Sequence, residues 1–168
     1  RDVMARLGGG VCLRTAVDPI GRDCGLTVTA ATSLSLDPPL VLVAVRQGSF
    51  IHDALSVAEG FALTVLAVDQ LALARYGARH RYPTDVDDFG PWETVRGHAS
   101  GSLVFTGGVA AVDCLPYGFV DAGDHTIALG RAVQTVFPTT GTIPLLHVDR
   151  AYYAPGTRLD RFDRSQDA

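Results

Sequence analysis

The sequence predicts a mostly β domain, a small closed or partly open β-barrel with a few short helices. Three observations lead to this fold class. The chain has 168 residues, the size of one domain with a core of its own. Hydrophobic residues make up 47% of it and charged residues only 19%, which excludes a disordered chain and a coiled coil. About seven segments have strand composition and are separated by Gly, Pro and Asp turns, which is typical of a barrel.

The elements follow in order along the chain. Residues 1–7 are predicted to be the end of a helix, which Gly8, Gly9 and Gly10 stop. The segments with strand composition are Val11–Thr15, Leu26–Thr32, Leu40–Arg46, Phe61–Leu66, Val109–Leu115, His125–Val136 and Leu145–Val148. Asp37, Pro38 and Pro39 form a rigid corner, because proline fixes φ and donates no ladder hydrogen bond.

Two short helices interrupt the strands. Ser49 is predicted to cap a helix over Phe50–Ala58, and Asp69 to cap a second one that runs to Tyr76 and stops at Gly77. Residues 78–101 are rich in Arg, Asp, Gly and Pro and are predicted to form a long surface loop. We therefore expect one domain over residues 1–155, followed by a flexible polar tail over residues 156–168.

Composition excludes several functions. The net charge of −4 offers no footprint for a nucleic-acid backbone, and no apolar run approaches the ~20 residues of a membrane span. All 14 basic residues are arginine, so Schiff-base chemistry and a Walker-type lysine are absent. The three cysteines are far apart and show neither a disulfide framework nor zinc spacing, which predicts a cytoplasmic protein.

Residues 27–36, TVTAATSLSL, are the most informative stretch. If they form one strand, the odd-numbered residues lie on one face and are all small, and four of those five bear hydroxyls. Such a face is either an ordinary solvated surface or a shallow shelf with approachable backbone, suited to a flat heterocycle. The pattern alone leaves both interpretations open.

The strand that follows ends at Arg46-Gln47-Gly48-Ser49, directly before the first predicted helix. Backbone N–H groups at a helix start, a hydroxyl and an arginine favour an anion site there. An ordinary capped helix with a solvated arginine is the alternative. The shelf and the anion site lie on consecutive strands, which matches a ligand made of a ring and a phosphate.

A turn between two apolar strands holds Asp124 and His125. His125 is the candidate functional histidine because it begins a strand beside a carboxylate, although a turn histidine without a role is also consistent with the pattern. The other histidines show no ligand spacing, so we expect no metal site. No G-x-G-x-x-G follows a strand, which excludes a Rossmann domain.

The run from Gly25 to Val43, GLTVTAATSLSLDPPLVLV, closely resembles the signature of the flavin reductase-like family. Three shorter stretches also resemble the family and occur in its order: Gly10-Val11 with Thr15, then Ser49 with His52, and the turn Gly123-Asp124-His125-Thr126-Ile127. The similarity spans residues 4–153, nearly the whole chain.

The resemblance implies an FMN-binding split β-barrel that forms a homodimer. It implies that Thr27, Val28 and Thr29 line the isoalloxazine and that Phe89 contacts the flavin. It further implies that four residues hold the ribityl chain and phosphate: Thr32, Ser33, Arg46 and Ser49. His125, with Asp124 beside it, would seat the nicotinamide.

The function predicted in this way is an NAD(P)H-dependent flavin reductase that passes hydride to FMN or FAD and supplies reduced flavin to a partner monooxygenase. Such a reaction needs alignment of two rings and little acid–base help, which explains why the sequence shows no pair of nucleophile and base. Two alternatives stay open. One is a flavin-dependent oxidase or monooxygenase that acts directly on a small organic substrate, and the other is a non-catalytic flavin- or haem-binding barrel.

Overall fold

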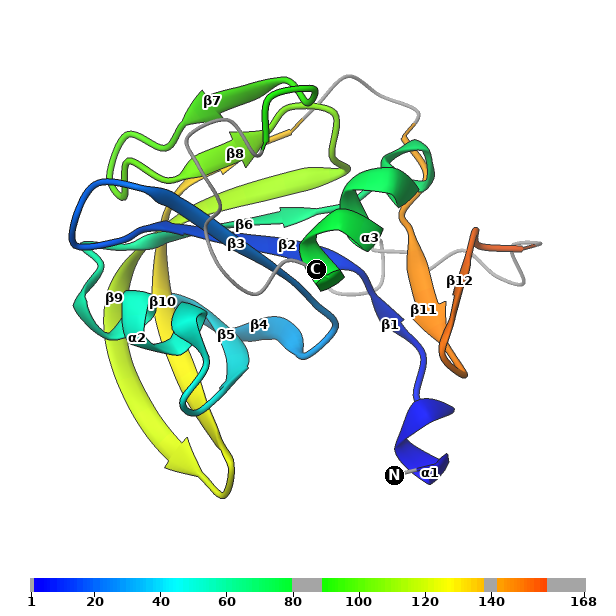
Figure 1. The fold of residues 1–168 in the computed structure, drawn as a ribbon, viewed down its shortest axis with the longest axis horizontal. Coiled ribbons are helices and arrows are strands. Elements are labelled where there is room, and N and C mark those ends of the chain that lie inside the picture. The colour runs from blue at the N-terminus through cyan, green and yellow to red at the C-terminus, as the bar shows by residue number, and fades with distance from the viewer. Residues whose placement is uncertain (1, 80–88, 138–141, 157–168) are drawn as a thin grey trace, which may run out of the picture.

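The computed structural model describes residues 2–79, 89–137 and 142–156 (Figure 1). Its centre is a seven-stranded antiparallel sheet with the strand order β3-β2-β6-β9-β10-β5-β4. These strands are β2 (Cys12–Val17), β3 (Asp23–Val28), β4 (Ala31–Leu36), β5 (Pro39–Arg46), β6 (Phe61–Val65), β9 (Ala110–Ala122) and β10 (His125–Val136). The predicted fold class, mostly β with a few short helices, is confirmed.

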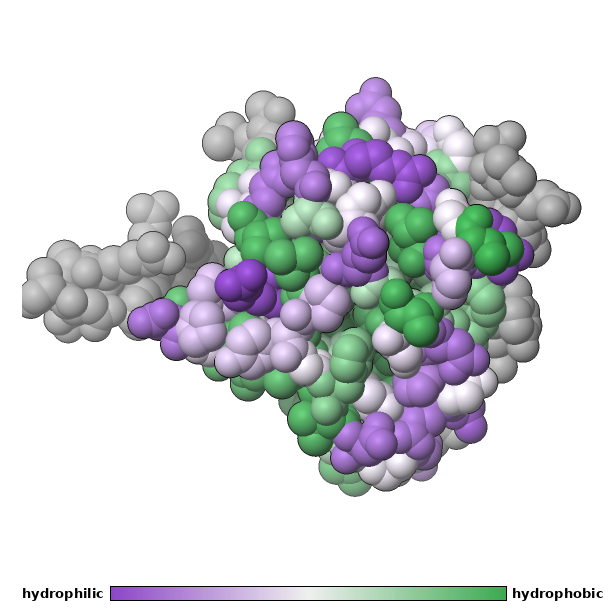
Figure 2. Space-filling view, turned by 90° about the vertical axis from the view of Figure 1, so that its left-hand side faces the viewer, coloured by the Kyte–Doolittle hydropathy of each residue, from purple (hydrophilic) through white to green (hydrophobic). Residues whose placement is uncertain are grey.

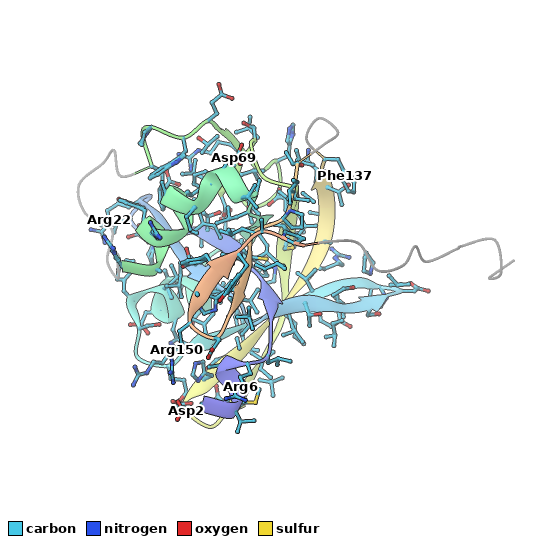
Figure 3. All side chains as sticks on the ribbon, turned by 90° about the vertical axis from the view of Figure 1, so that its right-hand side faces the viewer. Asp2, Arg6, Arg22, Asp69, Phe137 and Arg150 are labelled. Carbon is cyan, nitrogen blue, oxygen red and sulfur yellow. The ribbon has the colours of Figure 1, made fainter. Side chains whose placement is uncertain are left out.

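The remaining elements are short. One small sheet contains β1 (Gly9–Gly10), β11 (Leu146–Val148) and β12 (Ala151–Tyr153), and another pairs β7 (Thr94–Arg96) with β8 (Leu103–Phe105). The helices are α1 (Asp2–Ala5), α2 (Phe50–Val57) and α3 (Leu71–Arg79), and the 3-10 turn η1 (Val68–Gln70) precedes α3. Figure 3 shows α1 beside the β11–β12 turn, where Asp2 and Arg150 form an ion pair.

The seven-stranded sheet curls until its two edges meet at one corner. Its edge strands β3 and β4 are consecutive in the chain, and only Thr29 and Ala30 connect them. The carbonyl of Ala30 accepts a hydrogen bond from the Ala44 N–H at 2.9 Å, which fixes this connection against β5. No ladder joins β3 to β4 within the described residues, so the barrel is split, and the β4–β5 hairpin projects from it (Figure 3).

The interior of the barrel is apolar. It holds side chains from six of the seven strands, and α2 adds Ile51, Ala54 and Leu55 to the same cluster. All three cysteines lie there as free, buried thiols. Burial raises the pKa of Cys12 to about 11 and that of Cys114 to about 12, so both stay protonated at neutral pH.

A second apolar cluster lies outside the barrel. Here the outward-facing Leu13 of β2 packs with Leu73 and Ala74 of α3, and with Leu103 and Phe105 of β8. The outer face of one half of the sheet is therefore covered by α3 and the β7–β8 hairpin.

Residues 27–36 do not form one strand, and the predicted strand Leu26–Thr32 is interrupted at Thr29 and Ala30. Val28 ends β3 at one edge of the sheet, and Ala31 begins β4 at the other edge. The bend at Thr29 and Ala30 interrupts the alternation, so the hydroxyls before and after it do not share a face. A sequence pattern of period two does not reveal a corner that changes sheet edge.

The second predicted helix begins and ends at other residues than the sequence predicts. Asp69 lies inside η1, and the N–H of Ala67 is instead capped by the Gln70 side chain at 3.1 Å. The helix continues through Gly77 to Arg79. Gly77 is needed for close packing, because a Cβ there would lie 2.5 Å from Thr27 Oγ1 and 2.7 Å from Leu13 Cδ1.

Residues 80–88 of the predicted surface loop and residues 157–168 of the predicted tail lie outside the described residues. The described end of that loop includes a strand, β7. On the side seen in Figure 2, hydrophobic residues form several separate patches between hydrophilic ones. Across the described residues, no helix is both long and apolar enough to cross a membrane.

Candidate functional site

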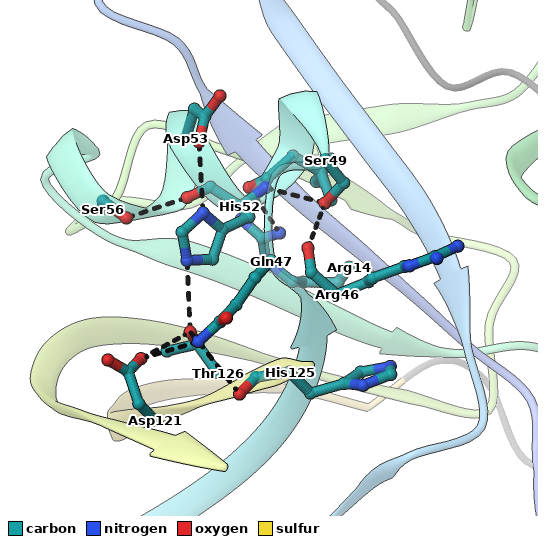
Figure 4. A network of polar contacts seen from close by, with 11 residues as sticks. Arg14, Arg46, Gln47, Ser49, His52, Asp53, Ser56, Asp121, His125 and Thr126 are labelled. Carbon is teal, nitrogen blue, oxygen red and sulfur yellow. Dashed lines mark hydrogen bonds and ion pairs between the residues drawn. The ribbon is translucent and has the colours of Figure 1, made fainter. Parts of the chain in front are cut away.

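Arg46 and His125 are direct neighbours in the sheet. Arg46 ends β5, His125 begins β10, and the register of the antiparallel ladder pairs the two residues. The residues next to them, Val45 and Thr126, are buried, so the alternation of the strands turns Arg46 and His125 outward. Figure 4 shows their side chains extending side by side in the same direction.

His125 is held by the residue before it. Its Nδ1 lies 2.7 Å from Asp124 Oδ1, while 43% of the His125 side chain stays exposed. The hydrogen bond from His125 lowers the pKa of Asp124, and the nearby His125 and Arg46 charges act in the same direction. A carboxylate only accepts hydrogen bonds, so Nδ1 carries the proton here. In the neutral ring Nε2 is then an outward-facing acceptor.

Ser49 occupies the predicted helix cap. Its Oγ accepts a hydrogen bond from the His52 N–H at 3.3 Å and donates one to the Arg46 carbonyl at 2.6 Å. The turn before it depends on Gly48, whose φ of +67° suits glycine. Ser49 therefore shapes the corner between β5 and α2, and it holds the main chain of Arg46.

The Arg46 guanidinium extends into solvent. It is exposed, and no ion pair involves it in the part of the chain that the structure describes. The Arg46 guanidinium can donate to a phosphate, and the His125 Nε2 acceptor can take the N–H of a carboxamide. The contact between Ala30 and Ala44 places the main chain of Thr29 toward the Arg46 end of β5, and a flavin contact of Thr29 stays a prediction.

Thr27 and Val28 have other surroundings. Thr27 Oγ1 donates to the Ala74 carbonyl of α3 at 2.9 Å, so this hydroxyl already has a partner. Val28 is buried in the barrel interior. The structure does not bring either side chain to Arg46 and His125, and their predicted role against the isoalloxazine stays a prediction.

Thr32 and Ser33 also lie apart from the Arg46 corner. They pair with Leu42 and Val41, so they are at least four residues, or about 13 Å, along β5 from Arg46. Both line a cleft of ≈ 190 Å³ whose other lining residues are Cys12, Ala31, Val41, Leu63, Val65, Ala110, Ala111 and Val112. This cleft contains no charged residue, so it is poorly suited to a phosphate.

Phe89 packs into the second apolar cluster. Its ring lies 5.7 Å from that of Tyr76 and 5.5 Å from that of Phe105, both in edge-on geometry. Its Cζ also lies over Gly25, where a Cβ would approach it to 2.9 Å. A flavin contact of Phe89 stays a prediction.

Comparison with known proteins settles the family. A model described as the flavin reductase like domain matches residues 4–156. The chain belongs to the flavin reductase-like family. This match confirms the resemblance found in the sequence. It also confirms the predicted class of enzyme, because the relatives are named as flavin reductases, which are oxidoreductases.

Three curated relatives are 33–38% identical to the chain. An actinorhodin polyketide dimerase of Streptomyces coelicolor is 38% identical over 92% of this chain and 84% of its own. An NADH:riboflavin 5'-phosphate oxidoreductase of Streptomyces pristinaespiralis is 33% identical over 92% of this chain and 86% of its own. An NADH-dependent FAD reductase of Streptomyces globisporus is 38% identical, and the match spans 65% of this chain and 60% of that reductase.

Solved structures of the family have the same fold. An NADH:FAD oxidoreductase of Streptomyces globisporus superposes with a TM-score of 0.85 at 30% identity, covering 94% of this chain and 92% of the other. The same enzyme has been solved in complex with NAD and FAD fragments. The cofactor classes expected from the sequence, a flavin and a nicotinamide, are those in the names of these relatives.

The sequence analysis missed three residues of this site. Gln47, Asp121 and Thr126 form hydrogen bonds with one another directly behind His125 (Figure 4). Gln47 follows Arg46, and Thr126 follows His125, so both lie next to predicted site residues. Only the pairing of β5 with β10 reveals that they meet.

Proposed function

We propose that the protein is an NAD(P)H-dependent flavin reductase that passes hydride to FMN or FAD. The observation that supports this most directly is the pairing of Arg46 with His125 on adjacent strands, both turned outward and free for a ligand. When bound, the flavin accepts the hydride that the nicotinamide gives up. The protein has only to bind and align the two rings.

Each residue of the site has a role in this proposal. Arg46 binds the flavin phosphate, and Ser49 fixes the corner from which Arg46 extends. Asp124 keeps a proton on His125 Nδ1, so the Nε2 acceptor is available for the carboxamide N–H of the nicotinamide. Thr29 lies at the edge of the same site. No proton transfer is required of any of these groups.

The reduced flavin would leave to supply a partner monooxygenase. Among the relatives are the reductase components of a resorcinol hydroxylase and of a trigonelline monooxygenase, which supports this use. The wide exposure of Arg46 and His125 also suits a flavin that enters and leaves. A cytoplasmic location stays a prediction from the cysteines.

We further propose a homodimer. The β9–β10 hairpin extends beyond the barrel (Figure 1), and its strand β9 exposes Tyr117, Phe119 and Val120 by 45–54%. Large apolar side chains grouped on one projecting hairpin are typical of a subunit interface. Light scattering of the purified protein tests this, and a single monomer peak at micromolar concentration contradicts it.

The test of the reductase activity is direct. Purified protein is mixed with NADH and either FMN or FAD, and the nicotinamide absorbance is followed; the same assay is run with NADPH. We expect catalytic oxidation with at least one pair. If neither flavin supports oxidation of either nicotinamide, the proposed function is wrong.

A second candidate function has one specific observation in its favour. The relative that is 38% identical over 92% of this chain is named a polyketide dimerase, so the family includes a member named for an organic substrate. An enzyme of that kind holds its flavin through the reaction. Flavin that stays with the protein after dialysis would favour it, whereas a reductase of the proposed type loses its flavin.

A further inference from the structure

Behind the Arg46–His125 pair, a polar network joins four elements at one hydroxyl. Thr126 Oγ1 on β10 lies 2.9 Å from Asp121 Oδ1 on β9, 3.3 Å from Gln47 Nε2 in the turn after β5, and 3.2 Å from His52 Nε2 on α2. Figure 4 shows this network on one side of the ladder, with the Arg46 and His125 side chains pointing away from it.

The donors and acceptors of the network determine its protons. The Asp121 carboxylate only accepts, so Thr126 donates its single proton there. Both remaining neighbours must then donate to the Thr126 oxygen. The Gln47 amide does so through Nε2, and His52 does so with a proton on its own Nε2. The other His52 nitrogen, Nδ1, lies 3.1 Å from the Asp53 carboxylate, which also only accepts, so both contacts form together only when the His52 ring carries a proton on each nitrogen.

The network lies where the ladder has no further support. His125 and Arg46 are the last pair between β10 and β5, and beyond them the β9–β10 turn is exposed. The end of a ladder opens more readily than its middle. Here two hydrogen bonds of Gln47 extend the ladder. Its backbone N–H donates to the Asp124 carbonyl at 3.0 Å, and its side-chain amide donates to Thr126 Oγ1.

Thr126 is well placed to control this end of the sheet. Only 5% of Thr126 is exposed, and 24% of the His52 side chain is exposed. Hydrogen bonds shielded in this way compete less with water than those of an exposed turn. They connect the strand that carries His125 to the helix that follows Arg46.

We propose that Thr126 and His52 are positioning residues that set the place of His125 relative to Arg46. This role rests on the proposed reductase function, in which these two side chains bind the nicotinamide and the flavin phosphate. The network of Thr126 and His52 lies on the side of the ladder away from the Arg46 and His125 side chains, so in this proposal the two residues act without contacting the ligands. Loss of the network lets the β9–β10 turn move, so nicotinamide binding weakens while the residues that bind it are all present.

The test uses Thr126→Val, which keeps the shape and removes the hydroxyl, and Thr126→Ser, which keeps the hydroxyl. We expect Thr126→Val to raise KM for NADH about fivefold with a smaller change in kcat, and Thr126→Ser to restore most of the wild-type value. His52→Gln keeps a donor near the place of Nε2, so it should disturb KM less than His52→Ala. Ser56→Ala is the matched control on α2, because Ser56 Oγ bonds the His52 carbonyl at 2.9 Å and does not contact Thr126 Oγ1.

A double variant separates positioning from general stability. If Thr126 acts through His125, adding Thr126→Val to His125→Ala raises KM no further. An equal rise in both backgrounds, or an unchanged KM in Thr126→Val, overturns the positioning role while the reductase function stands. Wild-type protein that oxidises no nicotinamide overturns the reductase function itself. Nitrogen NMR of the His52 ring gives a readout without activity: Nε2 carries a proton in the wild type, and an Nε2 without one contradicts the network.

Discussion

The β5–β10 end and the β3–α3 face of the same sheet use polar residues in opposite ways. At the β3–α3 face, Thr27 donates to the Ala74 carbonyl, and Gly77 allows the helix to approach. At the β5–β10 end, Arg46 and His125 turn outward and leave their ligand-binding groups free. In sequence both regions are short polar interruptions of apolar strands. What differs is whether a helix covers the outer face of the sheet.

This difference separates two kinds of substitution. Changes at the β3–α3 face should lower the free energy of unfolding, because they disturb close packing. Changes of Arg46 and His125 at the β5–β10 end should alter ligand binding and leave stability nearly unchanged, because Arg46 is exposed and 43% of the His125 side chain is exposed. Four predictions test this separation.

The largest effect is expected for Gly77→Val. A Cβ at this position already lies 2.5 Å from Thr27 Oγ1, and valine adds two methyl groups, so α3 must move away from β3. We expect the free energy of unfolding to fall by about 3 kcal/mol, measured by urea denaturation. Gly10→Val is the control, since a Cβ at Gly10 has nothing within 4 Å. Equal losses in the two variants would contradict tight packing of α3.

Arg46→Ala should weaken FMN binding about 10- to 50-fold, because one charge-assisted contact to phosphate is lost. Riboflavin, which has no phosphate, should bind within about twofold of wild type, and Tm should not change. Arg131→Ala is the matched control, an exposed arginine at the other end of the same ladder. Titration of flavin fluorescence measures binding to the wild type and to both variants. Equal weakening of FMN and riboflavin would exclude a phosphate contact.

His125→Ala should raise KM for NADH about fivefold and leave the Kd for FMN within about twofold, because only the nicotinamide loses a hydrogen-bond acceptor. His98→Ala removes an exposed histidine from the β7–β8 turn and should change neither value. Steady-state kinetics with a separate flavin titration distinguishes the two constants. An unchanged KM in His125→Ala would remove this residue from the site.

The smallest effect concerns the titration of Asp124. The hydrogen bond from His125 lowers the pKa of Asp124 in the folded protein, so this contact is present at neutral pH and is lost as pH falls through the lowered value. In His125→Ala the pKa should rise toward its ordinary value. Carbon NMR of the Asp124 carboxyl follows both titrations. A midpoint that is the same with and without His125 would show that the two side chains do not interact in solution.

Much of the fold could be predicted from sequence because local signals were strong. The cap at Ser49 was placed correctly, and the strand His125–Val136 has the predicted bounds. The family signature around residues 25–43 led to the split barrel. These features depend on residues that are close together in the chain, so the sequence alone carries the information needed to predict them.

The predictions that were wrong depend on residues distant in sequence. Gly77 was expected to end a helix, but its place is set by contacts with Leu13 and Thr27 on two strands. The segment Leu26–Thr32 was expected to form one strand, but the residues before and after Thr29 and Ala30 lie at opposite edges of the sheet. For the same reason the meeting of Gln47 with Thr126 was not foreseen, because it depends on the register of β5 with β10.

The two-residue link at Thr29 and Ala30 also determines where the chain tolerates insertions. Additional residues there would let the edge strands β3 and β4 drift apart, and the contact of Ala30 with Ala44 would be lost. The turn between β4 and β5 lies at the tip of a projecting hairpin, with Asp37 and Pro38 exposed. Additional residues at that tip would extend into solvent without disturbing the sheet. A reporter sequence or affinity tag placed inside this protein therefore belongs at the tip and not at the corner.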